Sequence, residues 1–169
     1  MKNYDFDPRN LPNEFHAAVG LAVTSWLQTE SVLTAAVSGV LGIDAVIGLA
    51  VTTHMSMPLR LSVLRSISKL RLKQAHQASL ENRIGDIETA HRKRNALVHH
   101  QWGYDPELQQ YFVIAEKAAE ELEAELQPKT LAQIEDDAEF IYDSGMGLMT
   151  FLIMTDLLPP LRHRMEAGA

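Results

Sequence analysis

Apolar residues recur along the chain at alternating intervals of three and four, the period of a helix that buries one face. The first run of this kind begins at Asn13, a favourable N-cap residue, and extends toward Gly39 or Gly42. Glu30 stands at the one missing position of its apolar stripe. We therefore predict a long first helix with a carboxylate on its buried face. The apolar members of the stripe are Phe15, Val19, Ala22, Trp26, Leu33, Val37 and Val40.

The same period predicts two further helical regions. One begins near Asp44, and Pro58 interrupts or restarts it because proline cannot donate the helical hydrogen bond. The next is expected over residues 79–101 and ends at a turn over residues 103–106, which contain glycine, aspartate and proline. Arg94 lies on the stripe of this helix, so a permanent charge stands where an apolar side chain is expected. The stripe consists of Leu80, Ile84, Ile87, His91, Arg94 and Val98.

The segment after this turn has a mixed pattern. Residues 111–114 fit a short strand, whereas residues 116–126, with the sequence EKAAEELEAEL, have a strong intrinsic preference for helix. Thr130 and Gln133 then form a capping box at the start of a last helix. Its apolar face consists of Leu131, Ile134, Ala138, Ile141, Gly145, Leu148 and Leu152.

These elements predict the fold class. The chain has 169 residues, which is the usual size of one domain, and it shows no internal repeat and no low-complexity tract. We predict a single all-α domain over residues 1–169, an antiparallel bundle of four to five helices joined by short loops. Residues 1–12 and 160–169 are expected to be flexible termini.

The composition narrows the chemistry and the location. The chain contains no cysteine, which excludes disulfides, thiolate metal sites and a cysteine nucleophile. The N-terminal residues lack the apolar core of a secretion signal. The longest apolar runs, residues 31–43 and 45–59, are shorter than the roughly 18 residues of a membrane-spanning helix. These features predict a cytoplasmic protein without a membrane partner.

Charge is distributed unevenly along the chain. The net charge is −7, but residues 60–94 contain nine Lys or Arg residues against three acidic residues. The rest of the chain carries six basic and nineteen acidic residues. Such a basic block can bind a polyanion. Equally, it can complement the acidic segment 105–143 within the fold or across a dimer, and the sequence leaves both interpretations open.

Glu30 and Arg94 are charged residues that both fall on apolar stripes. Because a buried charge is tolerated only when it is paired and hydrogen-bonded, we expect them to face each other or to share one polar cleft. His99 follows Arg94 by five residues, which is about 140° around an ideal helix. A joint site for Arg94 and His99 therefore requires either fraying of the helix after Val98 or a second copy of the chain. Arg92, seven residues before His99, lies on the same helical face as that histidine.

Other chemistries find less support. His99 and His100 are adjacent, so their side chains point in different directions, and neither has a carboxylate three or four residues later. We therefore expect no metal site. The SGMG segment at 144–147 lies inside a helical pattern, and the segment around Gly39 and Gly42 lacks the lysine and the strand of a phosphate loop. Both glycine-containing segments are better explained by close helix packing.

The segment RNALVHHQW, residues 94–102, resembles the signature of HEPN-type helical domains. In that signature an arginine and a polar residue are followed by three variable positions and a histidine, which here are Arg94, Asn95 and His99. The flanking pattern KRN-x-LVH-x-x-W is similar to that of small bacterial HEPN-like proteins. In these proteins a long first helix commonly carries a tryptophan shortly before a glutamate.

Trp26 and Glu30 match that tryptophan and glutamate, so the resemblance covers residues 13–102 and the last helix. It implies a bundle of four to five helices, usually a homodimer in which the two motifs meet near the dimer axis. Active members are metal-independent endoribonucleases, and they are often toxins with an antitoxin protein as partner. The resemblance thus implies RNA as substrate and no cofactor.

The resemblance also implies roles for single residues. His99 would exchange a proton with the ribose 2′-hydroxyl or with the leaving 5′-oxygen. Arg94 would stabilise charge on the scissile phosphate, and Asn95 would orient the phosphate or the histidine. Glu30 would hold Arg94.

Further residues have supporting roles in this interpretation. Arg92 and His100 flank the motif and are the supporting candidates. Contacts to RNA are expected from basic residues of the block around the motif, namely Arg65, Lys69, Lys73 and Lys93.

Two alternatives to catalysis stay open. The chain can be a non-catalytic HEPN-like interaction module, in which Glu30 and Arg94 form a structural buried ion pair. It can also be an unrelated helical protein that binds a small ligand in a cleft of histidine and arginine.

Overall fold

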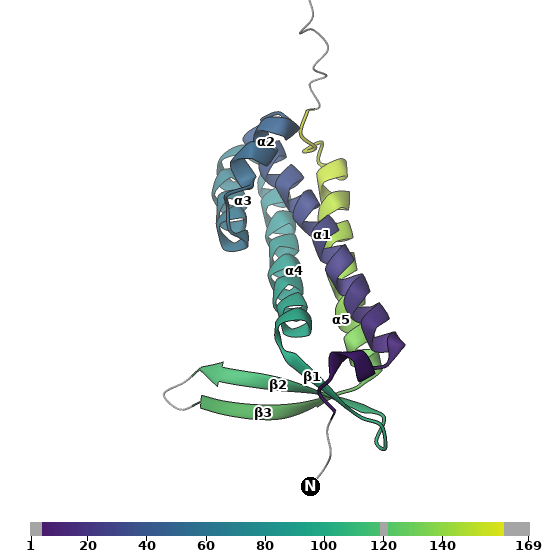
Figure 1. Cartoon of the computed structure of the whole chain (residues 1–169). Coiled ribbons are helices and arrows are strands. Elements are labelled where there is room, and N and C mark those ends of the chain that lie inside the picture. The colour runs from purple at the N-terminus through teal and green to yellow at the C-terminus, as the bar shows by residue number, and fades with distance from the viewer. Residues whose placement is uncertain (1–4, 119–121, 161–169) are drawn as a thin grey trace, which may run out of the picture. The chain divides into compact units, whose positions relative to one another are not determined.

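The computed structural model describes residues 5–118 and 122–160. These residues form five α-helices, a short 3-10 helix and three strands (Figure 1). The chain is therefore mostly helical, as predicted, but it is not all-α. The elements are η1 (Pro8–Asn10), α1 (Asn13–Leu41), α2 (Ala45–Thr52), α3 (Met57–Arg71), α4 (Gln74–His99), β1 (Gln101–Asp105), β2 (Gln110–Ala118), β3 (Leu122–Lys129) and α5 (Leu131–Met154).

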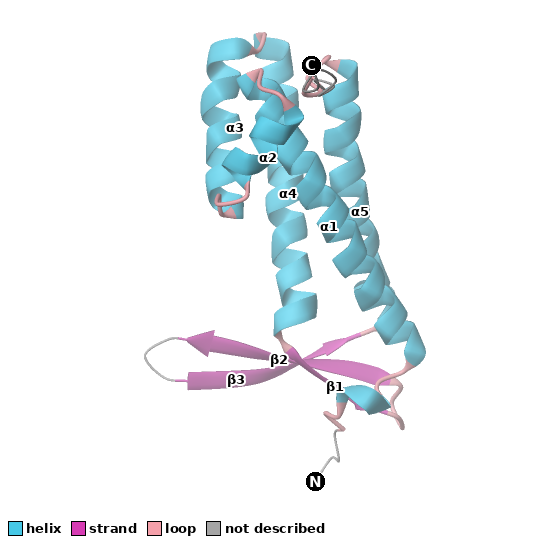
Figure 2. Ribbon diagram, turned by 45° about the horizontal axis from the view of Figure 1, so that its top comes forward, coloured by secondary structure: helices cyan, strands magenta, loops and turns pink. Residues whose placement is uncertain are grey.

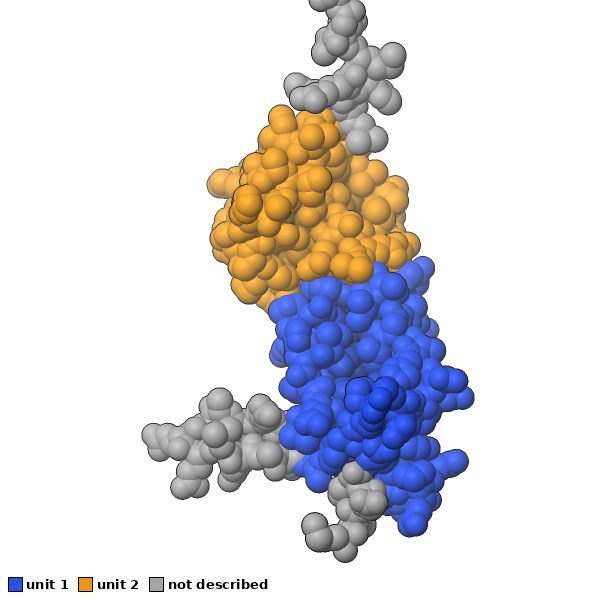
Figure 3. Space-filling view, viewed as in Figure 1, with its two compact units in different colours: residues 1–26, 89–142 blue, residues 27–88, 143–169 orange. Residues whose placement is uncertain are grey.

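The chain divides into two compact units, which are coloured separately in Figure 3. Unit 1 consists of residues 1–26 and 89–142, and unit 2 consists of residues 27–88 and 143–169. The three long helices α1, α4 and α5 each contribute residues to both units. Each unit has its own buried apolar side chains.

Unit 1 is built around aromatic side chains. Phe15, near the start of α1, packs against Trp102 of β1 and Tyr111 of β2, with ring centroids 5.1 and 5.3 Å apart. The ring of Tyr111 also lies 5.0 Å from that of Tyr104. Burial raises the pKa of the Tyr111 hydroxyl above its ordinary value, and the neighbouring Tyr104 adds to the shift. The other buried apolar residues of this unit are Leu11, Ala18, Ala22, Trp26, Ala90, Leu97, Phe112, Val113, Ile134, Ala138 and Ile141.

The three strands form one antiparallel sheet in the order β1–β2–β3 (Figure 2). β1 pairs with the first part of β2, and β3 pairs with β2 along most of its length. Asp5 adds a bridge to Tyr104 through two backbone hydrogen bonds of 3.3 and 3.0 Å. Gly103 is required beside this bridge, because a Cβ there would lie 2.7 Å from the ring of Phe6. Residues that were expected to be flexible, 5–12, thus include a bridge and η1, while 1–4 and 161–169 lie outside the described residues.

The helix predicted over residues 116–126 is wrong. Residues 116–118 belong to β2 and residues 122–126 belong to β3, while residues 119–121 lie outside the described part of the chain. The strand predicted over residues 111–114 is confirmed as the beginning of a longer β2. Intrinsic helix preference differs by at most about 0.7 kcal/mol per residue among ordinary residues, so it does not prevent residues 116–118 from pairing with residues 122–124 in an antiparallel arrangement.

Unit 2 has an aliphatic core and close contacts at its glycines. A Cβ on Gly145 of α5 would lie 2.3 Å from Oγ1 of Thr29 on α1, and one on Gly39 would lie 1.7 Å from the carbonyl oxygen of Leu157. The approach at Gly145 confirms the predicted close helix packing in segment 144–147, whereas Gly39 lies against the backbone that follows α5 and not against a helix. Gly42, with φ of 69°, follows the end of α1. The buried apolar residues of this unit are Val32, Leu33, Ala36, Val37, Val40, Leu61, Leu64, Leu80, Ile84, Ile87, Leu148, Phe151 and Leu152.

The helix starts follow the predicted signals. Asp44 caps α2 by accepting a hydrogen bond of 2.8 Å from the N–H of Val46, and Pro58 lies in the first turn of α3. Thr130 and Gln133 exchange two hydrogen bonds of 2.9 and 3.2 Å in the expected capping box of α5. No single helix in the described ranges is both long and apolar enough to cross a membrane. α1 and α2 meet that test only as a pair, which is bent by 113° at the break between them.

Candidate functional site

α4 ends in a connected set of polar side chains, which we call the Arg94 cluster: His91, Arg94, Asn95 and His99. Nη1 of Arg94 lies 3.0 Å from Nε2 of His99 and 3.1 Å from Oδ1 of Asn95. Nδ2 of Asn95 lies 3.2 Å from Nε2 of His91. All four residues belong to unit 1. The three residues predicted to be catalytic are therefore in contact within one chain.

The fixed donor character of arginine assigns the roles in this set of hydrogen bonds. A guanidinium only donates, so Oδ1 of Asn95 and Nε2 of His99 accept from Nη1 of Arg94. With its oxygen turned to Arg94, Asn95 directs its NH2 group at Nε2 of His91, which accepts as well. In this arrangement Nε2 of each imidazole is a hydrogen-bond acceptor. The cluster thus holds a permanent cation next to a histidine that can accept a proton.

Two tryptophans border the Arg94 cluster. The indole N–H of Trp102 donates a hydrogen bond of 3.0 Å to the carbonyl oxygen of Leu97, which lies in the last turn of α4. Because Trp102 is buried, this bond ties the turn that carries His99 to the core of unit 1. The ring of Trp26 on α1 lies 5.3 Å from the ring of His91. The end of α4 is therefore a braced position for polar side chains.

The members of the site differ in exposure. Arg94 and Asn95 are half-buried, whereas His99, His100 and Arg92 are exposed. The expectation that Arg94 and His99 can act together only after fraying or in a second copy is wrong. α4 runs to His99 without fraying, and the long arginine side chain spans the angle around the helix that separates the two residues.

The buried face of α4 changes by one residue near its end. Its first three predicted members are buried as expected, but Val98 is 36% exposed and Leu97 is buried in its place. His91 and Arg94 are half-buried and mark the edge of this face. At this edge the guanidinium of Arg94 reaches polar atoms near the surface, which it could not do from the centre of a core.

Lys93, predicted to contact RNA, forms an ion pair with Asp137 of α5. Its ammonium also lies 5.3 Å from the ring centroid of Phe140. Lys129 lies 4.0 Å from the same carboxylate. At this position the basic block complements the acidic segment within the fold, as one of the two interpretations of the charge pattern predicted.

The other predicted RNA contacts lie on α3 and just after it, in unit 2. Arg65 holds Glu81 at 2.9 Å and Glu88 at 2.9 and 3.0 Å, and both partners lie on α4. The hydrogen bonds that Arg65 donates to Glu88, and next the one that it donates to Glu81, raise the pKa of Arg65 above its ordinary value. Lys69 and Lys73 are exposed and form no ion pair with any residue that the structure describes. They are the more accessible cations of the block.

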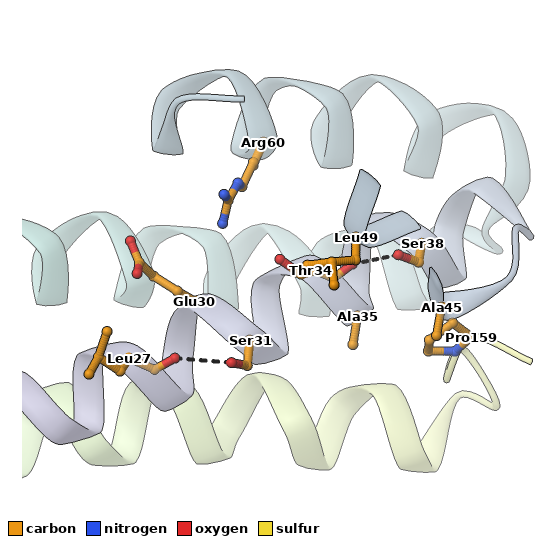
Figure 4. Close-up of a pocket in the computed structure, with 10 residues that line it drawn as sticks. All are labelled: Leu27, Glu30, Ser31, Thr34, Ala35, Ser38, Ala45, Leu49, Arg60 and Pro159. Carbon is orange, nitrogen blue, oxygen red and sulfur yellow. Dashed lines mark hydrogen bonds between the residues drawn. The ribbon is translucent and has the colours of Figure 1, made fainter. Parts of the chain in front are cut away.

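Glu30, the predicted partner of Arg94, belongs to unit 2. Its half-buried carboxylate lines a cavity there, together with Arg60 (Figure 4). In unit 1, Nε of Arg94 is buried and has no hydrogen-bond partner among the described atoms. A Glu30–Arg94 ion pair would join residues of the two units, and it stays a prediction.

His91 is a member of the cluster that sequence reasoning placed on the apolar stripe and did not select as a site residue. Its signal is the spacing of four residues to Asn95, which puts both side chains on one helix face. Among the described residues, no group of three or more His, Asp or Glu side chains is arranged to hold a metal ion.

Comparison of the chain with protein-family models, curated proteins and solved structures gave no match. The resemblance to HEPN-like domains therefore depends on the motif residues themselves, and it stays a prediction.

Proposed function

We propose that the chain is a metal-independent endoribonuclease of HEPN type, with Arg94 and His99 as its reacting pair. The observation that carries this proposal is the 3.0 Å contact between Nη1 of Arg94 and Nε2 of His99 at the exposed end of α4. Cleavage of RNA by its own 2′-hydroxyl needs a base for that hydroxyl and a fixed positive charge for the phosphate. His99 supplies the base and Arg94 supplies the positive charge, and their nitrogen atoms lie 3.0 Å apart.

Binding of a phosphate prepares the base. An anionic phosphate oxygen accepts a stronger hydrogen bond from a guanidinium than a neutral imidazole does. We expect the scissile phosphate to take over the Nη1 donor of Arg94, which frees Nε2 of His99. The bond between Arg94 and Asn95 keeps the guanidinium in place while this exchange happens.

The cleavage step then needs no further reactant. Nε2 of His99 takes the proton of the 2′-hydroxyl, and the 2′-oxygen forms a bond to phosphorus. The bond between phosphorus and the 5′-oxygen breaks, and the leaving oxygen takes a proton from the imidazolium or from water. The products are a 2′,3′-cyclic phosphate and a 5′-hydroxyl, and the dependence on the 2′-hydroxyl makes the reaction specific for RNA.

The remaining predicted residues differ in how available they are for contacts with RNA. Arg92 and His100 are exposed beside the pair and are free to approach a neighbouring phosphate or ribose. Lys69 and Lys73 are better candidates for RNA contacts than Arg65 and Lys93, whose charges are already paired with carboxylates. The homodimer and the antitoxin partner belong to the same proposal, and the molar mass of the protein in solution tests the first of them.

Lys93 and Arg65 each form ion pairs with carboxylates, and this also supports a second candidate function, a non-catalytic interaction module. Neutralised cations weaken attraction to RNA, and the net charge of the chain is −7. In that function the Arg94 cluster only stabilises the end of α4. The two candidates differ in whether RNA is cleaved and whether cleavage depends on His99.

The test is cleavage of a mixed RNA pool in EDTA at enzyme excess. Wild type is compared with His99→Ala, with Arg94→Lys, which keeps the charge and loses the planar fork, and with His54→Ala. His54 is an exposed histidine between α2 and α3 and serves as the matched control. We expect cleavage by wild type and His54→Ala and strong loss in both site variants. No cleavage by a folded wild-type protein would favour the interaction module.

A further inference from the structure

Unit 2 contains a cavity of about 510 Å³ that the Arg94 cluster does not use (Figure 4). This volume lies in the range of small-molecule sites, which is roughly 300–1,000 Å³. The later part of α1 forms one wall, and the beginnings of α2 and α3 and the segment after α5 complete it. The lining residues are Leu27, Glu30, Ser31, Thr34, Ala35, Ser38, Ala45, Leu49, Arg60 and Pro159.

Arg60 brings unused hydrogen-bond donors to this cavity. Its guanidinium extends from α3 toward α1, and its Nη2 donates a bond of 3.0 Å to the backbone oxygen of Thr52. Its Nε is buried and has no hydrogen-bond partner among the described atoms. A buried N–H of a charged group is costly to leave unpaired, typically by about 1–3 kcal/mol. This Nε is out of reach of a ligand in the cavity, but Nη1 is not fully buried and makes no hydrogen bond to a described residue, so an anionic group could accept from Nη1 and offset the charge of Arg60.

Glu30 brings the opposite charge to the same space. Figure 4 shows its carboxylate directed from α1 toward the side on which Arg60 lies. Within unit 2, the carboxylate of Glu30 makes no hydrogen bond and no ion pair of up to 4.0 Å with a described residue, so Glu30 and Arg60 are not paired with each other there. A cationic group of a ligand in the cavity could therefore pair with the carboxylate of Glu30.

The rest of the lining offers small polar and apolar contacts. The hydroxyls of Ser31 and Ser38 donate to carbonyl oxygens of the preceding turn of α1, at 3.2 and 2.8 Å (Figure 4). Ser38 is fully buried, whereas Ser31 is exposed, and its hydroxyl oxygen can still accept a hydrogen bond. Ala35, Leu49 and Pro159 supply apolar surface. A few fixed polar groups among small apolar side chains are typical of a site for a small polar molecule.

From these observations we propose that the cavity binds a small zwitterion of the amino-acid or dipeptide class. Its carboxylate accepts hydrogen bonds from Arg60, and its ammonium group lies against Glu30. A molecule with only one of these charges leaves the other protein charge without a partner. The proposal concerns unit 2 alone and does not depend on cleavage of RNA.

The test uses the full chain and thermal unfolding in the presence of millimolar α-amino acids and dipeptides. The matched probes are the N-acetyl derivatives, which lack the cation, and the amides, which lack the carboxylate. A binding zwitterion raises Tm, and the derivatives are expected to bind at least about tenfold more weakly, the equivalent of 1.4 kcal/mol. Amino acids and dipeptides are assayed separately, so the result also shows which of the two fits.

Variants then locate the binding. Arg60→Gln is expected to remove the preference for a free carboxylate, and Glu30→Gln the preference for a free ammonium group. Asp136→Asn, at an exposed carboxylate in unit 1, is the control and should bind like wild type. If circular dichroism shows that Arg60→Gln does not fold, Arg60→Lys replaces it, which keeps the charge and loses the buried Nε–H.

Three results would overturn the proposal. The first is that no zwitterion of either class raises Tm. The second is that the N-acetyl derivatives and amides bind wild type as well as the zwitterions do. The third is that folded Arg60 and Glu30 variants bind with unchanged affinity and selectivity.

Discussion

Two arginines, one in each unit, are similar in burial and differ in what holds them. Nε of Arg94 and Nε of Arg60 are both buried without a hydrogen-bond partner among the described atoms. Arg94 is held by the side chains of Asn95 and His99, whereas the one hydrogen bond described for Arg60 goes to a backbone oxygen. In the proposed function, the contact with Arg94 places a cation beside the histidine that acts as base. In the proposed ligand site, Arg60 faces a cavity and offers donors to an anion.

The largest effect should come from breaking the pair at Arg94. His99→Ala removes the base, so we expect the rate of RNA cleavage to fall by about 10²–10⁴-fold. Single-turnover cleavage in EDTA measures this loss, with His54→Ala as the control at an exposed histidine of unit 2. A His99→Ala rate within a few-fold of wild type would remove the reacting pair from the account.

The next largest effect concerns the packing beside the cavity of unit 2. A Cβ on Gly39 would lie 1.7 Å from the carbonyl oxygen of Leu157, which is backbone and cannot rotate away. Gly39→Ala should therefore lower the free energy of unfolding by about 1–3 kcal/mol. Gly20→Ala is the matched control, because a Cβ there meets nothing within 4 Å and alanine favours helix by about 1 kcal/mol. Urea unfolding of both variants checks the opposite signs.

A smaller effect is expected on the free energy of unfolding when each of the two arginines is replaced. Arg94→Met loses side-chain bonds to two residues, so we expect it to lower the free energy of unfolding by about 1–2 kcal/mol. Arg60→Met loses the bond to Thr52 and also removes an unpaired buried N–H, so its cost should stay below about 1 kcal/mol. Urea unfolding without added ligand measures both values. Equal costs would show that the difference in partners has no energetic meaning.

The smallest expected effect is a loss of stability at alkaline pH, which arises from Tyr111 in unit 1. Burial raises the pKa of Tyr111 in the folded state, so above the ordinary tyrosine pKa of about 10 the unfolded chain loses this proton first. Stability is therefore full below that pH and falls as pH rises. Tyr111→Phe keeps the ring contacts with Phe15 and Tyr104 and should flatten this fall. Thermal unfolding between pH 8 and about 11 measures the difference in slope.

Much of the helical fold could be predicted from the sequence, because its signals are local. The apolar stripe and Asn13 indicated the start of α1, the cap residues Asp44 and Thr130 indicated the starts of α2 and α5, and Pro58 indicated that of α3. The strands over residues 116–126 could not be predicted in this way. Residues 116–118 pair with residues 122–124 of the same segment, but its local preference is for helix, and no glycine, proline or asparagine in it indicates that the chain reverses.

The site was predictable in its members and not in its geometry. The motif named Arg94, Asn95 and His99, but angles on an ideal helix describe Cα positions and ignore the reach of a long side chain. His91 was not selected because its position fits the apolar stripe, and its contact with Asn95 reveals a polar role. Lys93 and Asp137, which neutralises its charge, lie far apart in the sequence. A count of basic residues therefore overstated the number of cations available to RNA.

The most direct test of the central claim is the chemistry of the RNA ends that the protein produces in EDTA. Mass spectrometry of the products should show 2′,3′-cyclic phosphate and 5′-hydroxyl ends for wild type, because the 2′-oxygen is the nucleophile at the Arg94–His99 pair. These ends should be absent with His99→Ala. Ends that carry a 3′-hydroxyl and a 5′-phosphate, cyclic phosphate ends that persist in the variant, or intact RNA with a folded wild-type protein would contradict it.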